Sequence, residues 1–239
     1  MDAVGGITRK RLIIEAIALL VSVFLALAVN AWWDRREARA VQRSQLTNLR
    51  DDFEQARAEI QEKLRYHTLI ASSVEDFRGR LETERMSTVV FVPDTLIIAL
   101  LSLPTLDLSN ATLEELEMSA RVSTISNVEL RRMIVAWPRV LHDAFWLEQT
   151  ARTLNEDHLI PLLRVSTDLA DAFALLPQWV ETGVDPEREV QMLPVRNSLA
   201  LRNVLAERKL RESWAADPLQ ESTAHVDSIL ALIDEELGS

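Results

Sequence analysis

The feature that most constrains this chain is an apolar run near its N-terminus. From Leu12 to Trp33 the only ionisable residue is Glu15. As a helix at roughly 1.5 Å per residue, the run would be about 33 Å long, which matches the hydrocarbon core of a bilayer. A short basic tail, residues 1–11, precedes it. The pattern predicts a transmembrane helix over residues 12–33.

A cleaved signal peptide is the alternative interpretation of the same run. The basic tail resembles the n-region of such a peptide, and the small residues at 26–28 resemble a cleavage site. The run is, however, longer than the roughly 7–15 apolar residues of an ordinary signal-peptide core. We therefore expect an uncleaved membrane anchor.

The run ends in the stretch LALAVNAWWDRREAR, residues 25–39. The indole rings of Trp32 and Trp33 suit the headgroup layer of a bilayer, and Arg35 and Arg36 belong in the water beside it. Basic residues flank both ends of the run, so the positive-inside rule is nearly balanced. A short basic tail usually stays in the cytoplasm, which predicts a cytoplasmic N-terminus and a periplasmic C-terminal domain.

Small and polar residues share one stripe of the predicted span. They recur at steps of three or four: Glu15, Ala18, Ser22, Ala26 and Asn30. Small residues let two membrane helices approach closely, and polar ones can form hydrogen bonds between them. The stripe predicts a helix-packing face. The alternative is local: Ala and Ser are common residues, and Glu15 can pair with Arg11 one turn away.

The rest of the chain, residues 34–239, predicts an all-α extramembrane domain. It is rich in Ala, Leu, Glu and Arg, and the whole chain has only 5 Gly and 1 Tyr. Apolar residues at steps of three or four indicate one long amphipathic helix over about 34–82. That helix suits either a coiled coil or an intrachain bundle, and the residues that follow favour an irregular helical bundle over 93–239.

Local signals place the shorter elements of this domain. A strand is indicated only at 88–92, and a short buried helix is expected after Asp94. Ser126 and Asp217 read as helix N-caps, the second with Pro218 behind it. A further helix is expected over 165–176.

The chemistry-bearing residues form no recognisable catalytic, cofactor or metal motif. The net charge of −11 argues against nucleic-acid binding, and the absence of Cys excludes thiolate sites. His67 lies on the apolar stripe of the long helix and reads as a hydrogen-bonded core residue. The segment 156–158, Glu-Asp-His, reads as solvated rather than metal-binding. Trp179, in a loop-like region, is the candidate partner contact.

Two blocks of this sequence resemble a family of uncharacterised bacterial single-span membrane proteins. The first is LALAVNAWWDRREAR with LTNLRDDFEQARAEI, and the second is TLEELEMSARVSTISNVELRRMIVAW, residues 112–137. Family members have a basic tail, an apolar span ending in an Asn/Trp motif, a long helix and a helical C-terminal domain. This chain has Ser119-Ala120 where the family tends to have Ser-Gly. The resemblance implies a single-pass protein of the bacterial inner membrane, with a cytoplasmic N-terminus and an extracytoplasmic helical domain. It implies no particular activity.

These observations favour a non-catalytic accessory or scaffold subunit of a larger membrane protein complex. Its expected partners are membrane lipids and other membrane-protein subunits, and assemblies of the respiratory or photosynthetic type are candidates. The alternative is a membrane-tethered periplasmic sensor or ligand-binding module that acts through a partner, which a pocket beside His142 and Trp146 would favour. An enzyme with dispersed carboxylates is the third and weakest hypothesis.

Overall fold

The computed structural model describes residues 3–108, 121–182 and 189–238, with the side chains of 19–108, 122–123, 125–176 and 189–238. It is mostly helical with one two-stranded sheet, which confirms the all-α prediction. The chain divides into two compact units, residues 1–49 and 50–239. In the described part of the chain, no stretch of helix combines the length and the apolar character that crossing a membrane requires.

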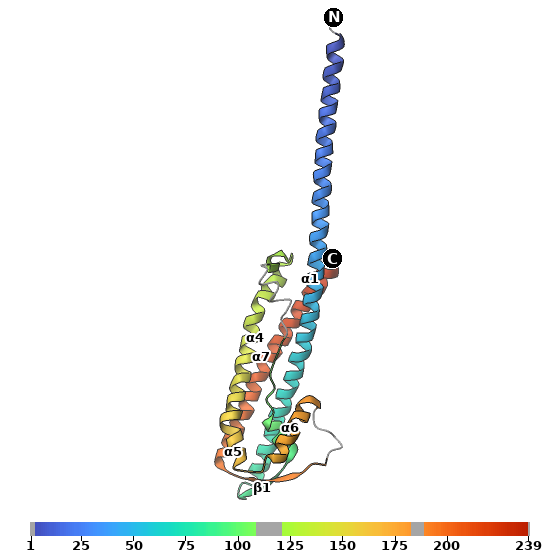
Figure 1. The fold of residues 1–239 in the computed structure, drawn as a ribbon. Helices are drawn as coiled ribbons and strands as arrows, with labels where there is room; N and C mark the ends of the chain where they lie inside the picture. Colours follow the sequence, from blue (N-terminus) through green and yellow to red (C-terminus); the bar gives the residue numbers. More distant parts are fainter. Residues whose placement is uncertain (1–2, 109–120, 183–188, 239) are drawn as a thin grey trace. The chain divides into compact units, whose positions relative to one another are not determined.

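Helix α1, Ala3–Thr83, is the longest element (Figure 1). No proline occurs before Pro93, so no missing backbone N–H interrupts the hydrogen bonding of α1. In the first unit, the helix carries the apolar run and the charged residues that follow it. In the second unit, from Arg50 on, one face of α1 is buried at Phe53, Ala56, Ile60, His67, Ile70, Val74, Phe77 and Leu81.

Three helices form the body of the second unit: α1 from Arg50 on, α4 (Val128–Leu154) and α7 (Leu199–Gly238). They lie side by side in Figure 1. Ion pairs join Arg50 to Asp234 and Lys209 to Glu75, so α7 runs antiparallel to α1. Contacts of Arg208 with Ala151 and of His225 with Met133 show that α7 is antiparallel to α4 as well.

Steps of four and three residues separate the buried positions of α4 and α7. On α4 they are Leu130, Ile134, Trp137, Leu141, Ala144, Glu148 and Ala151, and on α7 they are Leu201, Leu205, Arg208, Glu212, Ala215, Leu219, Ser222 and Val226. This 4-3 alternation is the heptad spacing of helices that pack along one seam. The bundle therefore carries a coiled-coil-like seam within one chain, as the bundle interpretation expects.

Strands β1 (Val89–Pro93) and β2 (Met192–Arg196) pair antiparallel at one end of the bundle, beyond the C-terminus of α1. Val90 lies opposite Val195, and both side chains are buried. The first strand confirms the prediction for 88–92. The second was missed because Pro194 and the loop-like residues before it mask the alternation.

Short helices close the same end of the bundle. Helix α2 (Asp94–Leu101) follows β1, and a π-helical turn (Asn155–Leu159) joins α4 to α5 (Ile160–Arg164) and then α6 (Ala170–Thr182). With a short 3-10 helix at Arg121–Thr124, they complete the described elements. Apolar residues of α2, both strands and α5 pack with Phe77 and Leu81 of α1 in one buried cluster.

Three expected boundaries differ in the structure. The cap of α4 is Asn127, one residue after Ser126, because its short amide oxygen reaches the N–H groups of Glu129 and Leu130. Helix α7 continues through Pro218 and does not begin at Asp217, because buried neighbours on both sides hold the helix where a hydrogen bond is lost. Residues 165–169 are not helical, so the helix expected over 165–176 begins at Ala170.

Candidate functional site: a buried ion network

A network of ionisable side chains lies inside the bundle, where apolar residues would be expected. His67 comes from α1, Glu148 from α4, and Arg208 and Glu212 from α7. All four side chains are almost completely buried. Charges removed from water are costly unless they are paired, so the contacts among these four residues decide whether the bundle tolerates them.

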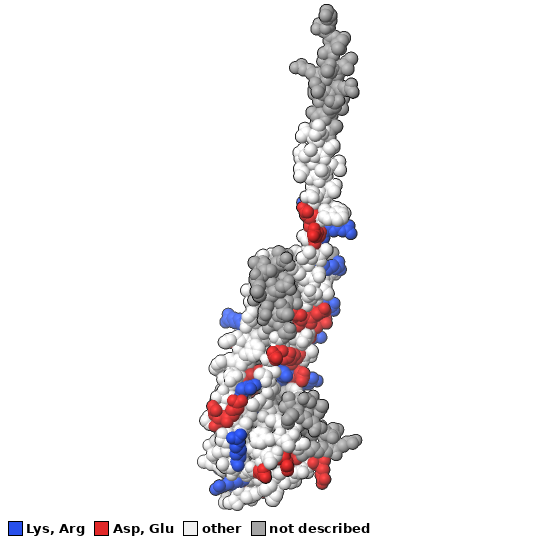
Figure 2. All heavy atoms as spheres, viewed as in Figure 1, with Lys and Arg blue, Asp and Glu red and all other residues white. Residues whose placement is uncertain are grey.

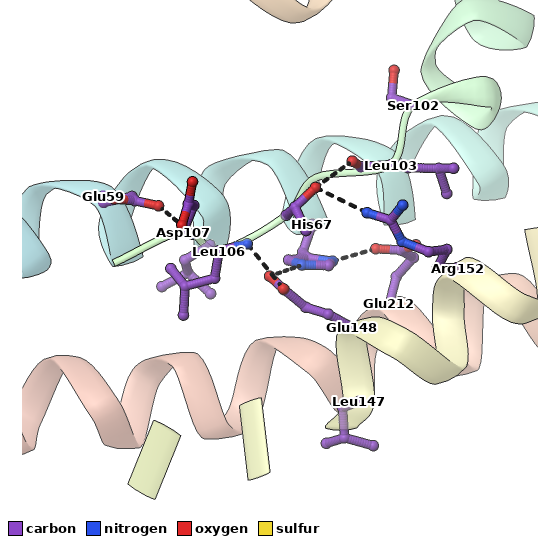
Figure 3. A network of polar contacts seen from close by, with 12 residues as sticks. Glu59, His67, Ser102, Leu103, Leu106, Asp107, Leu147, Glu148, Arg152 and Glu212 are labelled. Atoms are coloured by element: carbon purple, nitrogen blue, oxygen red, sulfur yellow. Dashed lines mark hydrogen bonds and ion pairs between the residues drawn. The ribbon is translucent and has the colours of Figure 1, made fainter. Parts of the chain in front are cut away.

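His67 lies between two carboxylates (Figure 3). Its Nδ1 atom is 2.5 Å from Oε2 of Glu212, and its Nε2 atom is 3.4 Å from Oε1 of Glu148. Both ring nitrogens therefore face an acceptor, which only the doubly protonated imidazolium satisfies. One histidine thus links all three long helices, and its prediction as a hydrogen-bonded core residue is confirmed.

The balance of burial and neighbouring charge sets the pKa of His67. Burial disfavours the imidazolium, but hydrogen bonds and Coulomb attraction from Glu148 and Glu212 outweigh it and raise the pKa from 6.5 to about 9. His67 is consequently protonated at neutral pH. The network then contains two cations and two carboxylates.

Arg208 supplies the second cation. Its Nη2 atom is 2.7 Å from Oε1 of Glu212, one helical turn along α7. Its guanidinium also donates to the backbone carbonyls of Ala151 (2.6 Å) and Ser102 (3.2 Å). Burial lowers the pKa of Arg208, and the charge of Glu212 acts in the opposite direction. Arg208 therefore satisfies one backbone carbonyl in the last turn of α4 and one at the end of α2.

The network also holds the extended segment that follows α2. Oε2 of Glu148 accepts the backbone N–H of Leu106 at 3.0 Å, and Glu59 accepts that of Asp107 at 2.6 Å. Arg152 donates to the hydroxyl of Thr105 at 2.9 Å. Figure 3 shows this segment running along α1 with its backbone facing these side chains. The carboxylate of Glu148 therefore serves the histidine and the segment at once.

These residues occupy heptad core positions, and that placement carries the physical consequence. Glu148, Arg208 and Glu212 take places in the 4-3 series of α4 and α7 that Leu, Ile or Ala take elsewhere. A sliding of one helix by a turn would separate the charges and leave them buried without partners. The arrangement suits fixing the register of three helices. The 4-3 spacing of these residues is visible in the sequence. What the sequence analysis did not predict is that charged residues occupy core positions of this spacing.

The residues predicted for the membrane segment lie on α1 in the first unit. Ser22, Ala26 and Asn30 line a shallow groove on this helix together with Leu25, Val29 and Trp33. Asn30 also donates to Asp34 at 3.4 Å, one turn further on. The side chains of Glu15 and Ala18 lie outside those that the structure describes, so three members of the stripe are placed.

The end of the apolar run has an ordered aromatic arrangement. Trp32 and Trp33 are both more than half exposed and contact each other edge to face, with centroids 6.1 Å apart. The guanidinium of Arg36 lies 5.5 Å from the ring centroid of Trp32, within the range of a cation–π interaction. Arg35 is exposed beside them.

The remaining candidates do not assemble into a second site. Residues 156–158 are exposed on the π-helical turn, as the sequence predicts. His142 and Trp146 are exposed on α4 and line neither the groove on α1 nor the cleft between α1 and residues 102–105. Among the described residues, no three His, Asp or Glu side chains could together hold a metal ion. Trp179 lies in helix α6 and not in a loop as the sequence suggested, and its side chain lies outside those described.

Comparison with known proteins does not assign this chain to a family. No family model matches the chain, and no match was found among curated proteins or solved structures. The resemblance to single-span bacterial proteins therefore stays a prediction.

Proposed function

We propose that this chain is a non-catalytic accessory or scaffold subunit of a larger membrane protein complex. Residues 12–33 anchor it, and the helical bundle is the part it presents outside the membrane. The N-terminus is cytoplasmic and the bundle periplasmic, in a bacterial inner membrane. The proposal rests on one observation above the others, the exposure of the apolar run on every side of α1.

That exposure is continuous over the described part of the run. Between residues 19 and 33 every large hydrophobic side chain is about half exposed or more: Leu19, Leu20, Val21, Val23, Phe24, Leu25, Leu27, Val29, Trp32 and Trp33. These residues cover the whole circumference of a helix, since successive side chains turn by about 100°. Figure 2 shows the uncharged stretch ending at a cluster of acidic and basic residues. An apolar surface of this kind needs lipid or other apolar helices around it.

The buried network supports the scaffold part of the proposal. Its four side chains contact one another and the backbone, and Nε of Arg208 is a buried polar atom of the network without a hydrogen-bond partner in the described part of the chain. A fixed helical register gives a rigid body, which suits a subunit that holds partners in place. In the described part of the bundle, the cleft between α1 and residues 102–105 encloses about 120 Å³ and gives a ligand-binding module no support. Ligand pockets usually hold roughly 300–1,000 Å³.

The groove of Ser22, Ala26 and Asn30 is the proposed contact with partner helices in the membrane. Ala18→Leu with Ala26→Leu would fill the stripe. Ala28→Leu with Ala31→Leu makes the same chemical change on the opposite side of the helix and is the matched control. Each chain is extracted in gentle detergent and its co-purifying proteins are identified. We expect the first pair to lose its partners and the second to keep them.

Two results would count against this proposal. A wild-type chain that purifies as a partner-free monomer defeats the scaffold function. Equal retention of partners by both double variants removes the stripe from the contact and leaves the anchor to be tested separately.

A further inference from the structure

One edge of the two-stranded sheet is open. In the ladder, the N–H of Asp94 donates to Gln191 and that of Asn197 donates to Thr88, so the even-numbered residues of β1 bond to β2. Hydrogen bonding alternates along an antiparallel strand, and the N–H and C=O groups of Val89 and Phe91 therefore point away from β2. Within the described part of the chain, these groups have no hydrogen-bond partner.

The other edge of the sheet is blocked at Pro194 and Arg196. The outward N–H of Arg196 on β2 donates to the carbonyl of Ser166 at 2.8 Å, and Pro194 has no N–H to offer. Natural sheets usually protect an open edge with charged residues. Strand β1, with the sequence VVFVP, carries no charged residue, and its outward edge is blocked only at Pro93, beyond Val89 and Phe91. Its side chains Val89 and Phe91 are 45% and 58% exposed.

We propose that β1 pairs with β1 of a second copy of this chain to form a four-stranded sheet across a twofold axis. The axis passes at Val90, which places Val89 of each copy opposite Phe91 of the other. Both residues point their N–H and C=O groups outward, so this register forms four hydrogen bonds. It also places a β-branched residue beside an aromatic one twice on the exposed face, a favourable cross-strand pair.

Because β1 carries no charged side chain, two copies can pair along this strand without charge repulsion between the strands. The net charge of −11 on each chain opposes contact between copies, and the uncharged strand β1 adds nothing to this repulsion. Arg85, just before β1, is already paired with Glu82 at 3.1 Å. Edge-to-edge pairing therefore needs no buried charge.

The small area of this contact means that pairing requires a high local concentration of chains. Five residues per strand bury less than the roughly 1,000 Å² that a stable interface in solution exceeds. Two copies held in one membrane meet at a much higher effective concentration. The pairing thus rests on the proposed membrane anchor, and we expect it in membranes and not in dilute detergent.

Cysteine cross-linking tests the register, since the chain has no cysteine of its own. Val89→Cys and Phe91→Cys chains of different tag length are reconstituted together in phosphatidylcholine vesicles and oxidised mildly. Opposed Cα atoms of a hydrogen-bonded pair lie about 5.5 Å apart, within disulfide range. Two copies of residue 89, or two of residue 91, are offset by two positions and lie roughly 8–9 Å apart, beyond that range.

We expect the mixed disulfide to exceed either self-disulfide at least fivefold. Leu210→Cys, on α7, is 46% exposed and serves as the control for random collision. Equal yields in all combinations, or no disulfide among chains that float with the vesicles, would overturn the pairing. Flotation is scored in the same samples. A mixed disulfide without flotation supports the register of the pairing but rejects both the anchor and the dependence of the pairing on the membrane. The loss of both the disulfide and flotation rejects both proposals.

Discussion

Nδ1 of His67 and Oε2 of Glu212 lie 2.5 Å apart, although 145 residues separate them in the sequence. The contact joins α1 to α7 in the interior of the bundle, and Glu148 brings α4 to the other ring nitrogen. Because both atoms are removed from water, the contact matters more than an exposed ion pair of the same length. The first prediction therefore concerns the loss of this contact.

Glu212→Gln should destabilise the bundle strongly. The substitution leaves Arg208 buried without its carboxylate and removes the nearer partner of His67, and breaking a buried pair in this way costs about 3–5 kcal/mol. Glu207→Gln is the matched control, since Glu207 pairs with Arg211 on the exposed side of the same helix. It should cost about 0.5 kcal/mol or less. Urea unfolding in mild detergent, followed by circular dichroism, measures both, and similar losses would contradict the network.

Stability should fall as the pH rises above neutrality. The pKa of His67 is about 9 in the folded chain and 6.5 as its ordinary value, so its contribution is complete below pH 6.5 and disappears as the pH passes about 9. The two pKa values differ by an amount equivalent to about 3 kcal/mol. Unfolding midpoints of the wild type and of His67→Gln are compared between pH 6 and 10. The wild type should lose the additional stability, and parallel curves would show that His67 is not charged in the bundle.

Trp137 makes a second link between the same three helices. It is completely buried on α4, stacks on His225 of α7 with centroids 5.9 Å apart, and contacts Phe53 of α1 edge to face at 5.6 Å. Trp137→Ala should cost about 3–5 kcal/mol, because the cavity cannot close fully. Trp146→Ala on the exposed side of α4 should cost within about 0.5 kcal/mol. Equal effects in urea unfolding would place Trp137 outside the core.

The cap of α4 gives a smaller and more local prediction. Oδ1 of Asn127 accepts the N–H groups of Glu129 and Leu130 at 3.0 and 3.1 Å. Asn127→Ala should lower the free energy of unfolding by about 1 kcal/mol, and Asn127→Asp should retain it because Asp caps equally well. If Asp is as damaging as Ala, the acceptor oxygen is not the stabilising feature.

Helix content and the first strand could be predicted from the sequence because their signals are local. Apolar residues at steps of three and four positions define the buried face of α1, and the β-branched and aromatic residues 89–92 indicate a strand without reference to a partner. His67 could be placed in the core by the same spacing. Its need for polar partners could be inferred, but not their identity.

The partners of His67 depend on packing and not on local pattern. Glu148 and Glu212 look like the many acidic residues on exposed helix faces, and only the alignment of α4 and α7 puts them at the seam. Strand β2 was hidden for a related reason, since Met192–Arg196 becomes a strand only beside β1. Continuation of α7 through Pro218 likewise depends on the buried neighbours of that turn.

Alkaline carbonate extraction of bacterial membranes that contain the full chain tests the proposed anchor most directly. We predict that the wild type stays in the membrane pellet, and that Leu20→Asp with Leu27→Asp moves the chain to the soluble fraction. Each Asp near the centre of a span costs about 2.5–3.5 kcal/mol. Val41→Asp, a change at a half-exposed residue of α1 beyond the apolar run, should have no effect. Release of the wild-type chain by carbonate would contradict the anchor.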